Sequence, residues 1–321
     1  MSKISYQASA RLALGGLIGA ILCSPVLAGD EFTPCADAAL PGLAGSLCAV
    51  SHMPLRPNDP EAGAVDIFIR KFPSATETTT GEVWLIAGGP GESGASFYPF
   101  LDTLRAAFPD RDLIIPDHRG TGYSTRLCPA EEAADSEGGH ALAGAEWGSC
   151  IGGMYGDIDR THAFTVTNAS HDLSQLITRY RSEGSVQVYG VSYGTQLILR
   201  MLQTAPVPLD GVVLDGLIPP EASPEWDLSH RTAVVDKSGR SLLSADQVQA
   251  YAALLATPDR QVLWAESTPG GDLRRFLATL LNFPELRDQI PAVISALTEG
   301  DSSRLVAVRA AVAAAFVHLG Q

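Results

Sequence analysis

The stretch "VQVYGVSYGTQLILR" (residues 186–200) constrains the fold of this chain more than any other. A short apolar run ends at "GVSYG", and a pattern with helical spacing begins directly after it. This arrangement predicts a strand, a sharp turn on Ser192 and a helix. Gly190 and Gly194 lack side chains at the point where the strand and the helix come closest. The pattern therefore predicts that Ser192 is a nucleophile presented on a strained turn.

Short apolar runs alternate with helical patterns on both sides of this turn. This alternation predicts an α/β fold with a mostly parallel, doubly wound sheet. Loops that follow parallel strands meet at one edge of such a sheet, so residues 88–91, residues 117–120, Ser192 and Asp215 should cluster. The expected strands are 64–72, 82–88, 112–117, 186–192 and 210–216, and the expected helices are 101–108, 167–181 and 193–203. Ser170 or Asn168 is expected to cap the second helix.

Two regions differ from this alternation. Residues 118–160 are polar and glycine-rich and are expected to form a long loop. From residue 219 onward the chain is first Pro-rich and then helical, with no further strand expected. Ser244, followed three residues later by Gln247, has the pattern of a capping box.

The first 28 residues have the features of a secretory signal. A positively charged start precedes the apolar run 12–23, which is too short to favour a membrane-spanning helix, and "VLA" before Gly29 fits a cleavage site. An uncleaved N-terminal anchor is the alternative. We expect cleavage after Ala28, a secreted or periplasmic protein, and no stable membrane anchor after cleavage.

The remaining cysteines agree with export. Four cysteines allow three pairings, and the sequence-local one, Cys35–Cys48 with Cys128–Cys150, is favoured because each pair falls within one loop-like segment. The rival is a metal site. The chain has no CxxC motif and no histidine at ligand spacing beside a cysteine, so no metal is expected.

Charge and motifs exclude further classes. The formal net charge of −14 argues against a nucleic-acid partner, since phosphate binding requires a basic face. The glycines at 88–91 have neither the spacing of a dinucleotide-binding loop nor the lysine of a P-loop. No cofactor is expected, and oligomeric state is not predicted.

An acyl-transfer serine needs donors for the oxyanion that develops during attack. The N–H of Tyr193, at the start of the helix, is one candidate. Gly89 is the other, since Pro90 has no N–H; a plain glycine turn is the alternative. Asp117 and Arg119 are expected to pair and brace their loop. Asp215 is expected to cap a loop, and the alternative is that it orients a histidine.

Four motifs together resemble secreted tripeptidyl aminopeptidases and the related proline iminopeptidases of the α/β-hydrolase superfamily. They are "GGPGESG" (88–94), "DHRGTGYST" (117–125), "YGVSYGTQ" (189–196) and "VVLDGLIPP" (212–220). The resemblance covers roughly residues 32–300. It implies hydrolysis of peptides from a free N-terminus, or of small amides and esters. Glu92 replaces a more usual glycine, and it is either a solvated carboxylate or a ligand for a substrate ammonium group.

The resemblance also implies a division of the chain. We expect a signal peptide (1–28), an irregular disulfide-tied segment (29–63), an α/β-hydrolase core (64–218) and a helical cap (219–321).

The family places its acid and histidine after the cap, on loops that follow two more strands, and this chain offers no good match. His118 precedes the serine, against the family order, and is expected to be structural. His230 and His318 follow the serine, but neither follows a predicted strand. Three hypotheses remain: an aminopeptidase recorded as an incomplete chain, an esterase- or lipase-like enzyme that uses His318, and a non-catalytic binding protein on a hydrolase scaffold.

Overall fold

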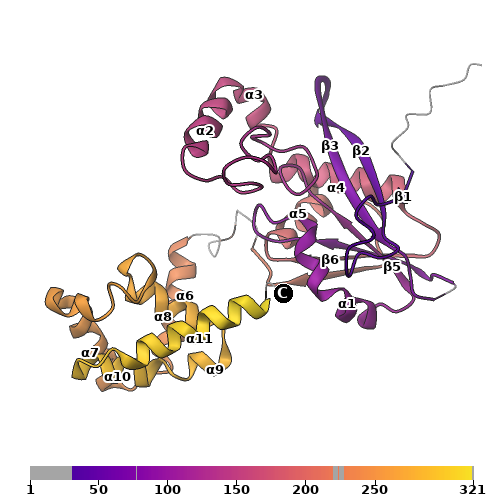
Figure 1. Cartoon of the computed structure of the whole chain (residues 1–321). Helices are drawn as coiled ribbons and strands as arrows, with labels where there is room; N and C mark the ends of the chain where they lie inside the picture. Colours follow the sequence, from indigo (N-terminus) through magenta and orange to yellow (C-terminus); the bar gives the residue numbers. More distant parts are fainter. Residues whose placement is uncertain (1–30, 77, 220–222, 224–227, 320–321) are drawn as a thin grey trace, which may run out of the picture.

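A seven-stranded sheet contains all the strands of the described residues, between Thr33 and Asp215 (Figure 1). The structure is a computed structural model, and it describes residues 31–76, 78–219, 223 and 228–319. The strand order is β1-β2-β3-β5-β4-β6-β7, in which β5, β4, β6 and β7 are mutually parallel. The strands are β1 (Thr33–Pro34), β2 (Leu47–Arg56), β3 (Asp59–Phe72), β4 (Gly81–Ile86), β5 (Arg111–Pro116), β6 (Ser185–Val191) and β7 (Gly211–Asp215).

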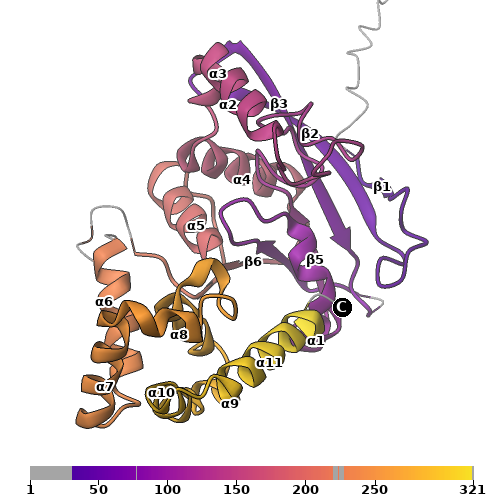
Figure 2. The same cartoon turned by 60° about the vertical axis from the view of Figure 1, so that its left-hand side comes forward.

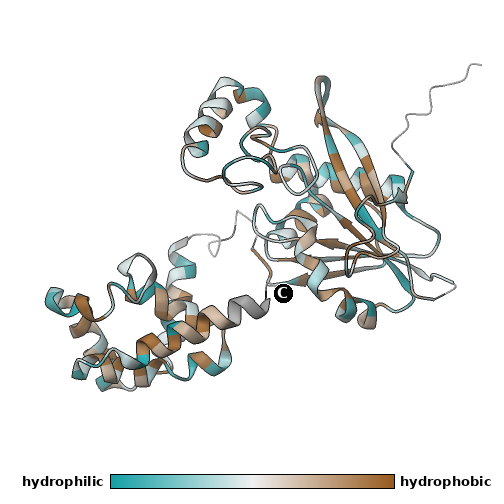
Figure 3. Cartoon of the chain, viewed as in Figure 1, coloured by the Kyte–Doolittle hydropathy of each residue, from teal (hydrophilic) through white to brown (hydrophobic). Residues whose placement is uncertain are grey.

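The strands predicted from the sequence are confirmed, and the central ones are the most buried. Every residue of β4 is buried, as expected for a strand covered on both faces. Accordingly, the central strands are coloured mostly brown, the hydrophobic end of the scale, in Figure 3.

The segment before residue 64 is not irregular, contrary to expectation. β2 and β3 form a long antiparallel hairpin, and β3 joins the parallel strands through antiparallel pairing with β5. Along β2 the buried positions alternate, but they include Ala49 and Ser51 as well as Met53 and Leu55. Because a small and a polar residue occupy inward positions, the period of two is hard to see in the sequence.

Helices cover both faces of the sheet. Helix α1 (Leu101–Ala107) packs on one face together with the 3₁₀ helix η1 (Gly94–Phe100). Helices α4 (Val166–Tyr180) and α5 (Tyr193–Thr204) pack on the other. The expected cap of α4 was wrong: Thr165 caps it, and its hydroxyl accepts a hydrogen bond from the N–H of Asn168.

Two short helices interrupt the stretch 118–160, which was expected to be a loop. They are α2 (Glu146–Gly156) and α3 (Ile158–Thr161). Helix α2 carries Cys150, which forms a disulfide with Cys128, and Cys35 pairs with Cys48. The sequence-local pairing of the four cysteines is therefore confirmed.

The described residues from Leu228 onward form a separate helical layer, which lies to one side of the sheet in Figures 1 and 2. It has its own hydrophobic core, centred on Leu273, Leu280 and Leu297. Within the described residues no strand follows β7, and the capping box of Ser244 and Gln247 is present. The elements are α6 (Leu228–Arg240), α7 (Ala245–Ala256), η3 (Pro258–Leu263), η4 (Pro269–Gly271), α8 (Leu273–Leu280), α9 (Pro284–Arg287), α10 (Ile290–Glu299) and α11 (Ser303–Leu319).

The predicted signal peptide, residues 1–28, lies outside the described residues. In the part of the chain that is described, none of the helices has the length and apolar character needed to cross a bilayer.

Candidate active site

Ser192 occupies the turn between β6 and α5. Its φ of 51° and ψ of −116° make it the one non-glycine residue with positive φ among the described residues. Such a backbone conformation costs on the order of 1–3 kcal/mol and persists only when surrounding structure imposes it. The turn presents Ser192 at the carboxyl end of the sheet, directly before the first residue of α5.

The two flanking glycines are required by close backbone contacts. A Cβ on Gly194 would lie 2.3 Å from the carbonyl oxygen of Ile86, at the end of β4. A Cβ on Gly190 would lie 2.9 Å from the backbone of Gly194. The crowding that the sequence pattern predicted is therefore present on both sides of the turn.

The loops expected to cluster do meet around Ser192. The N–H of Ser192 donates to the carbonyl oxygen of Asp215, 2.8 Å away, at the end of β7. A Cβ built on Gly88 would lie 3.3 Å from Ser192 Cβ and 3.2 Å from the Glu92 carboxylate. The ring of His118 lies 5.4 Å from that of Tyr193.

Each of the two predicted oxyanion donors directly follows a residue of this cluster in the sequence. Gly89 follows Gly88 in the loop after β4, and Tyr193 is the first residue of α5. Within the described residues, neither backbone N–H donates to a protein acceptor. The positive end of the α5 dipole also faces this region, which favours negative charge there. Their role as donors stays a prediction.

Asp117 and Arg119 do not pair with each other, so this expectation was wrong. The buried Asp117 carboxylate accepts hydrogen bonds from the N–H of Gly94, at 2.6 Å, and of Tyr123, at 2.8 Å. Burial raises its pKa. A Cβ on Gly122 would lie 1.8 Å from this carboxylate, so the close contact requires glycine there. Asp117 thus connects its own loop to "GGPGESG", a link that the sequence analysis missed.

Arg119 instead forms a buried bidentate ion pair with Asp172 on α4. Its Nε and Nη2 each lie 2.7 Å from one carboxylate oxygen. Its Nη1 donates to the carbonyl oxygens of Leu55 and Ala163, at 2.8 and 2.9 Å. The guanidinium therefore connects the end of β2, the loop after β5 and helix α4 beneath the site.

Comparison with known proteins identifies the family. The model of the "alpha/beta hydrolase fold" family matches residues 83–292, which is more than half of the chain. The chain belongs to this family. No curated protein matches this α/β hydrolase.

Solved structures similar to this α/β hydrolase are distant. An epoxide hydrolase from Aspergillus niger is 16% identical, with a TM-score of 0.36, over 84% of this chain and 60% of that one. A putative epoxide hydrolase from Pseudomonas aeruginosa is 16% identical, with a TM-score of 0.34, over 87% and 76%. A thermophilic esterase from Thermogutta terrifontis is 16% identical, with a TM-score of 0.32, over 77% and 68%. This α/β hydrolase spans about 60% of the length of the first solved structures that it matches.

Two titratable groups that contact neighbours of Ser192 in this α/β hydrolase have shifted pKa values. Burial lowers the pKa of His118 to about 4, so its ring is uncharged at neutral pH. The hydroxyl of Tyr189 donates to the Asp215 carboxylate at 2.7 Å, and this bond raises the pKa of Tyr189 to about 12. The Asp215 carboxylate therefore already has a partner on β6, which sequence reasoning did not anticipate.

No histidine of the described residues forms a hydrogen bond with Ser192 Oγ. His230 is exposed on α6, while the side chain of His318 lies outside the described part of this α/β hydrolase. A search of the described residues for clusters of histidine, cysteine and carboxylate that could hold a metal ion finds none.

Proposed function

We propose that Ser192 is the nucleophile of a serine hydrolase that cleaves peptides from a free N-terminus. The backbone conformation of Ser192 carries this proposal, because a strained turn between a parallel strand and a helix exposes the hydroxyl at the edge of the sheet. Ser192 Oγ attacks the scissile carbonyl carbon and forms an ester as the amine leaves with a proton. Water then attacks the ester and releases the acid.

The oxyanion formed in each step accepts hydrogen bonds from the N–H groups of Tyr193 and Gly89. Both amides lack a protein acceptor in the described residues, so they are available without breaking a bond. Deprotonation of Ser192 Oγ needs a general base. Within the described residues, no side chain that could act as this base forms a hydrogen bond with Ser192 Oγ. Acylation by activated esters depends less on such a base than cleavage of a peptide does. Acylation by these esters is therefore the step to measure.

Glu92 supports the preference for a free N-terminus. Its side chain is exposed and has no hydrogen-bond partner within the described residues. Its carboxylate lies beside the same Gly88 position that borders Ser192 Cβ. An ammonium group next to the scissile bond is the cation that this carboxylate can reach.

The substrate preference can be measured as single-turnover acylation. We expect the p-nitrophenyl ester of alanine to acylate Ser192 about tenfold faster than the N-acetylated ester, since a charged hydrogen bond contributes roughly 1.5–3 kcal/mol. Glu92→Gln should remove most of this preference. Glu183→Gln, an exposed carboxylate before β6, should keep it. Equal rates for the two esters in the unmodified chain would support the esterase-like alternative instead.

We also propose that the protein is exported. Two disulfides within one chain are typical of proteins that fold in an oxidising compartment.

A further inference from the structure

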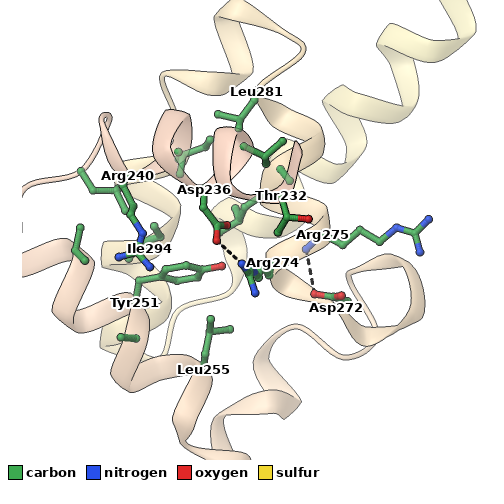
Figure 4. Close-up of a pocket in the computed structure, with 18 of the residues that line it drawn as sticks. Thr232, Asp236, Arg240, Tyr251, Leu255, Asp272, Arg274, Arg275, Leu281 and Ile294 are labelled. Carbon is green, nitrogen blue, oxygen red and sulfur yellow. Dashed lines mark hydrogen bonds and ion pairs between the residues drawn. The ribbon is translucent and has the colours of Figure 1, made fainter. Parts of the chain in front are cut away.

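A second site lies in the helical layer, in a pocket of about 740 Å³ between α6, α7, α8 and α10 (Figure 4). This volume is typical of small-molecule sites. All of its lining residues fall between residues 231 and 294, and none comes from the sheet or from the loops around Ser192. The pocket is therefore separate from the candidate active site.

The floor of the pocket is apolar. Leu277, Ile290 and Ile294, which belong to the core of the helical layer, line its base. Val248 and Leu281 are half-buried along its wall. Such a floor suits an alkyl chain or an aromatic ring, because burying apolar surface against it removes that surface from water.

The pocket lining carries more positive than negative charge. The lining includes four arginines (Arg231, Arg240, Arg274 and Arg275) and two aspartates, Asp236 and Asp272. Arg274 is neutralised by an ion pair with Asp236, and Asp272 caps α8 by accepting from the N–H of Arg275. An excess of arginine over aspartate among the lining residues is unusual in a chain whose formal net charge is −14, and it favours an anion.

Two groups of this lining have unused hydrogen-bond donors. Within the described residues, neither the guanidinium of Arg240 nor the hydroxyl of Tyr251 has a hydrogen-bond partner. Figure 4 shows the ring of Tyr251 pointing into the pocket, with its hydroxyl toward Arg274 and Asp236. Burial raises the pKa of Tyr251 to about 12, so the hydroxyl stays protonated and can donate.

We propose that this pocket binds an amphipathic monocarboxylate, such as a medium-chain fatty acid. The alkyl chain lies on the floor formed by Leu277, Ile290 and Ile294. The carboxylate accepts from Arg240 and from the hydroxyl of Tyr251.

Calorimetric titration of the full chain tests the ligand class with three probes. Decanoate should bind with one site per chain. Butyrate, which has the same head group, and decyltrimethylammonium, which has the same chain with a cationic head, should each bind at least about tenfold more weakly. If the cationic probe binds as tightly as decanoate, the proposed anion site is wrong.

Paired variants test the location. Arg240→Gln should weaken decanoate about tenfold, and Tyr251→Phe several-fold, whereas Arg304→Gln on α11 should change nothing. Ala252→Trp should fill the pocket and abolish binding, while Ala253→Trp, an exposed position on α7 outside the pocket, should not. Equal binding by both tryptophan variants would place decanoate elsewhere and overturn the proposal. If Ala252→Trp does not fold, the comparison of Arg240→Gln with Arg304→Gln and the three probes still test the proposal.

Discussion

Replacing Arg119 by methionine should lower the free energy of unfolding by about 3–5 kcal/mol. The substitution leaves the carboxylate of Asp172, which is 3% exposed, without its bidentate partner inside the protein. It also removes the donors that satisfy the carbonyl oxygens of Leu55 and Ala163. A buried charge that has lost its partner accounts for most of the expected loss. Urea denaturation followed by circular dichroism measures it.

A surface pair provides the control. Arg287→Met removes the pair with Asp288, in which the side chains are 43% and 69% exposed, and should cost less than about 1 kcal/mol. The double variant Arg119→Met with Asp172→Leu should recover part of the loss, since no uncompensated charge then remains buried. An effect of Arg119→Met no larger than that of Arg287→Met would contradict the buried network.

Gly194→Ala should abolish acylation of Ser192 and destabilise the protein by about 1–3 kcal/mol. The added Cβ would lie 2.3 and 2.8 Å from the carbonyl oxygens of Ile86 and Ala87. Both contacts are with backbone, which no side-chain rotation can relieve, so the start of α5 has to move away from β4. That movement displaces Ser192 and the N–H of Tyr193 together.

Gly152→Ala is the matched substitution. Gly152 lies within α2, and a Cβ there meets no atom within 4 Å. Alanine should therefore be neutral or stabilise the helix by up to about 1 kcal/mol, with acylation unchanged. The steric account fails if Gly194→Ala acylates at the rate of the unmodified chain.

The turn at Ser192 could be predicted because its causes are local. The strand, the helix and both glycines lie within 15 residues of sequence, and each follows from spacing and side-chain size. The clustering of the loops followed in turn from the rule that parallel strands end at one edge. The disulfides were predictable for a similar reason, since each joins cysteines 13 or 22 residues apart.

The long-range polar contacts could not be predicted. Arg119 has an aspartate two residues away, yet it pairs with Asp172, 53 residues along the chain. Asp117 is instead occupied by two backbone amides, and its approach depends on the absence of a side chain at Gly122. Charge type and sequence distance alone do not show whether Arg119 pairs with Asp117 or with Asp172.

Strand β2 and helix α2 were missed because their hydrophobic pattern is weak. In β2 the inward Ser51 is fully buried, and its hydroxyl accepts from Arg179 on α4, at 2.6 Å. A polar residue at an inward position interrupts the alternation that marks a strand. Helix α2 contains several glycines, which disfavour helix, but a disulfide at Cys150 ties it to the preceding loop.

The most direct test of the central claim is the mass of the chain after reaction with a fluorophosphonate. We expect one phosphonyl group per chain, on the peptide that contains Ser192. Ser192→Ala should remove it, while Ser238→Ala, at an exposed hydroxyl on α6, should not. Unlabelled protein, or labelling that survives Ser192→Ala, would contradict the assignment of Ser192 as the nucleophile.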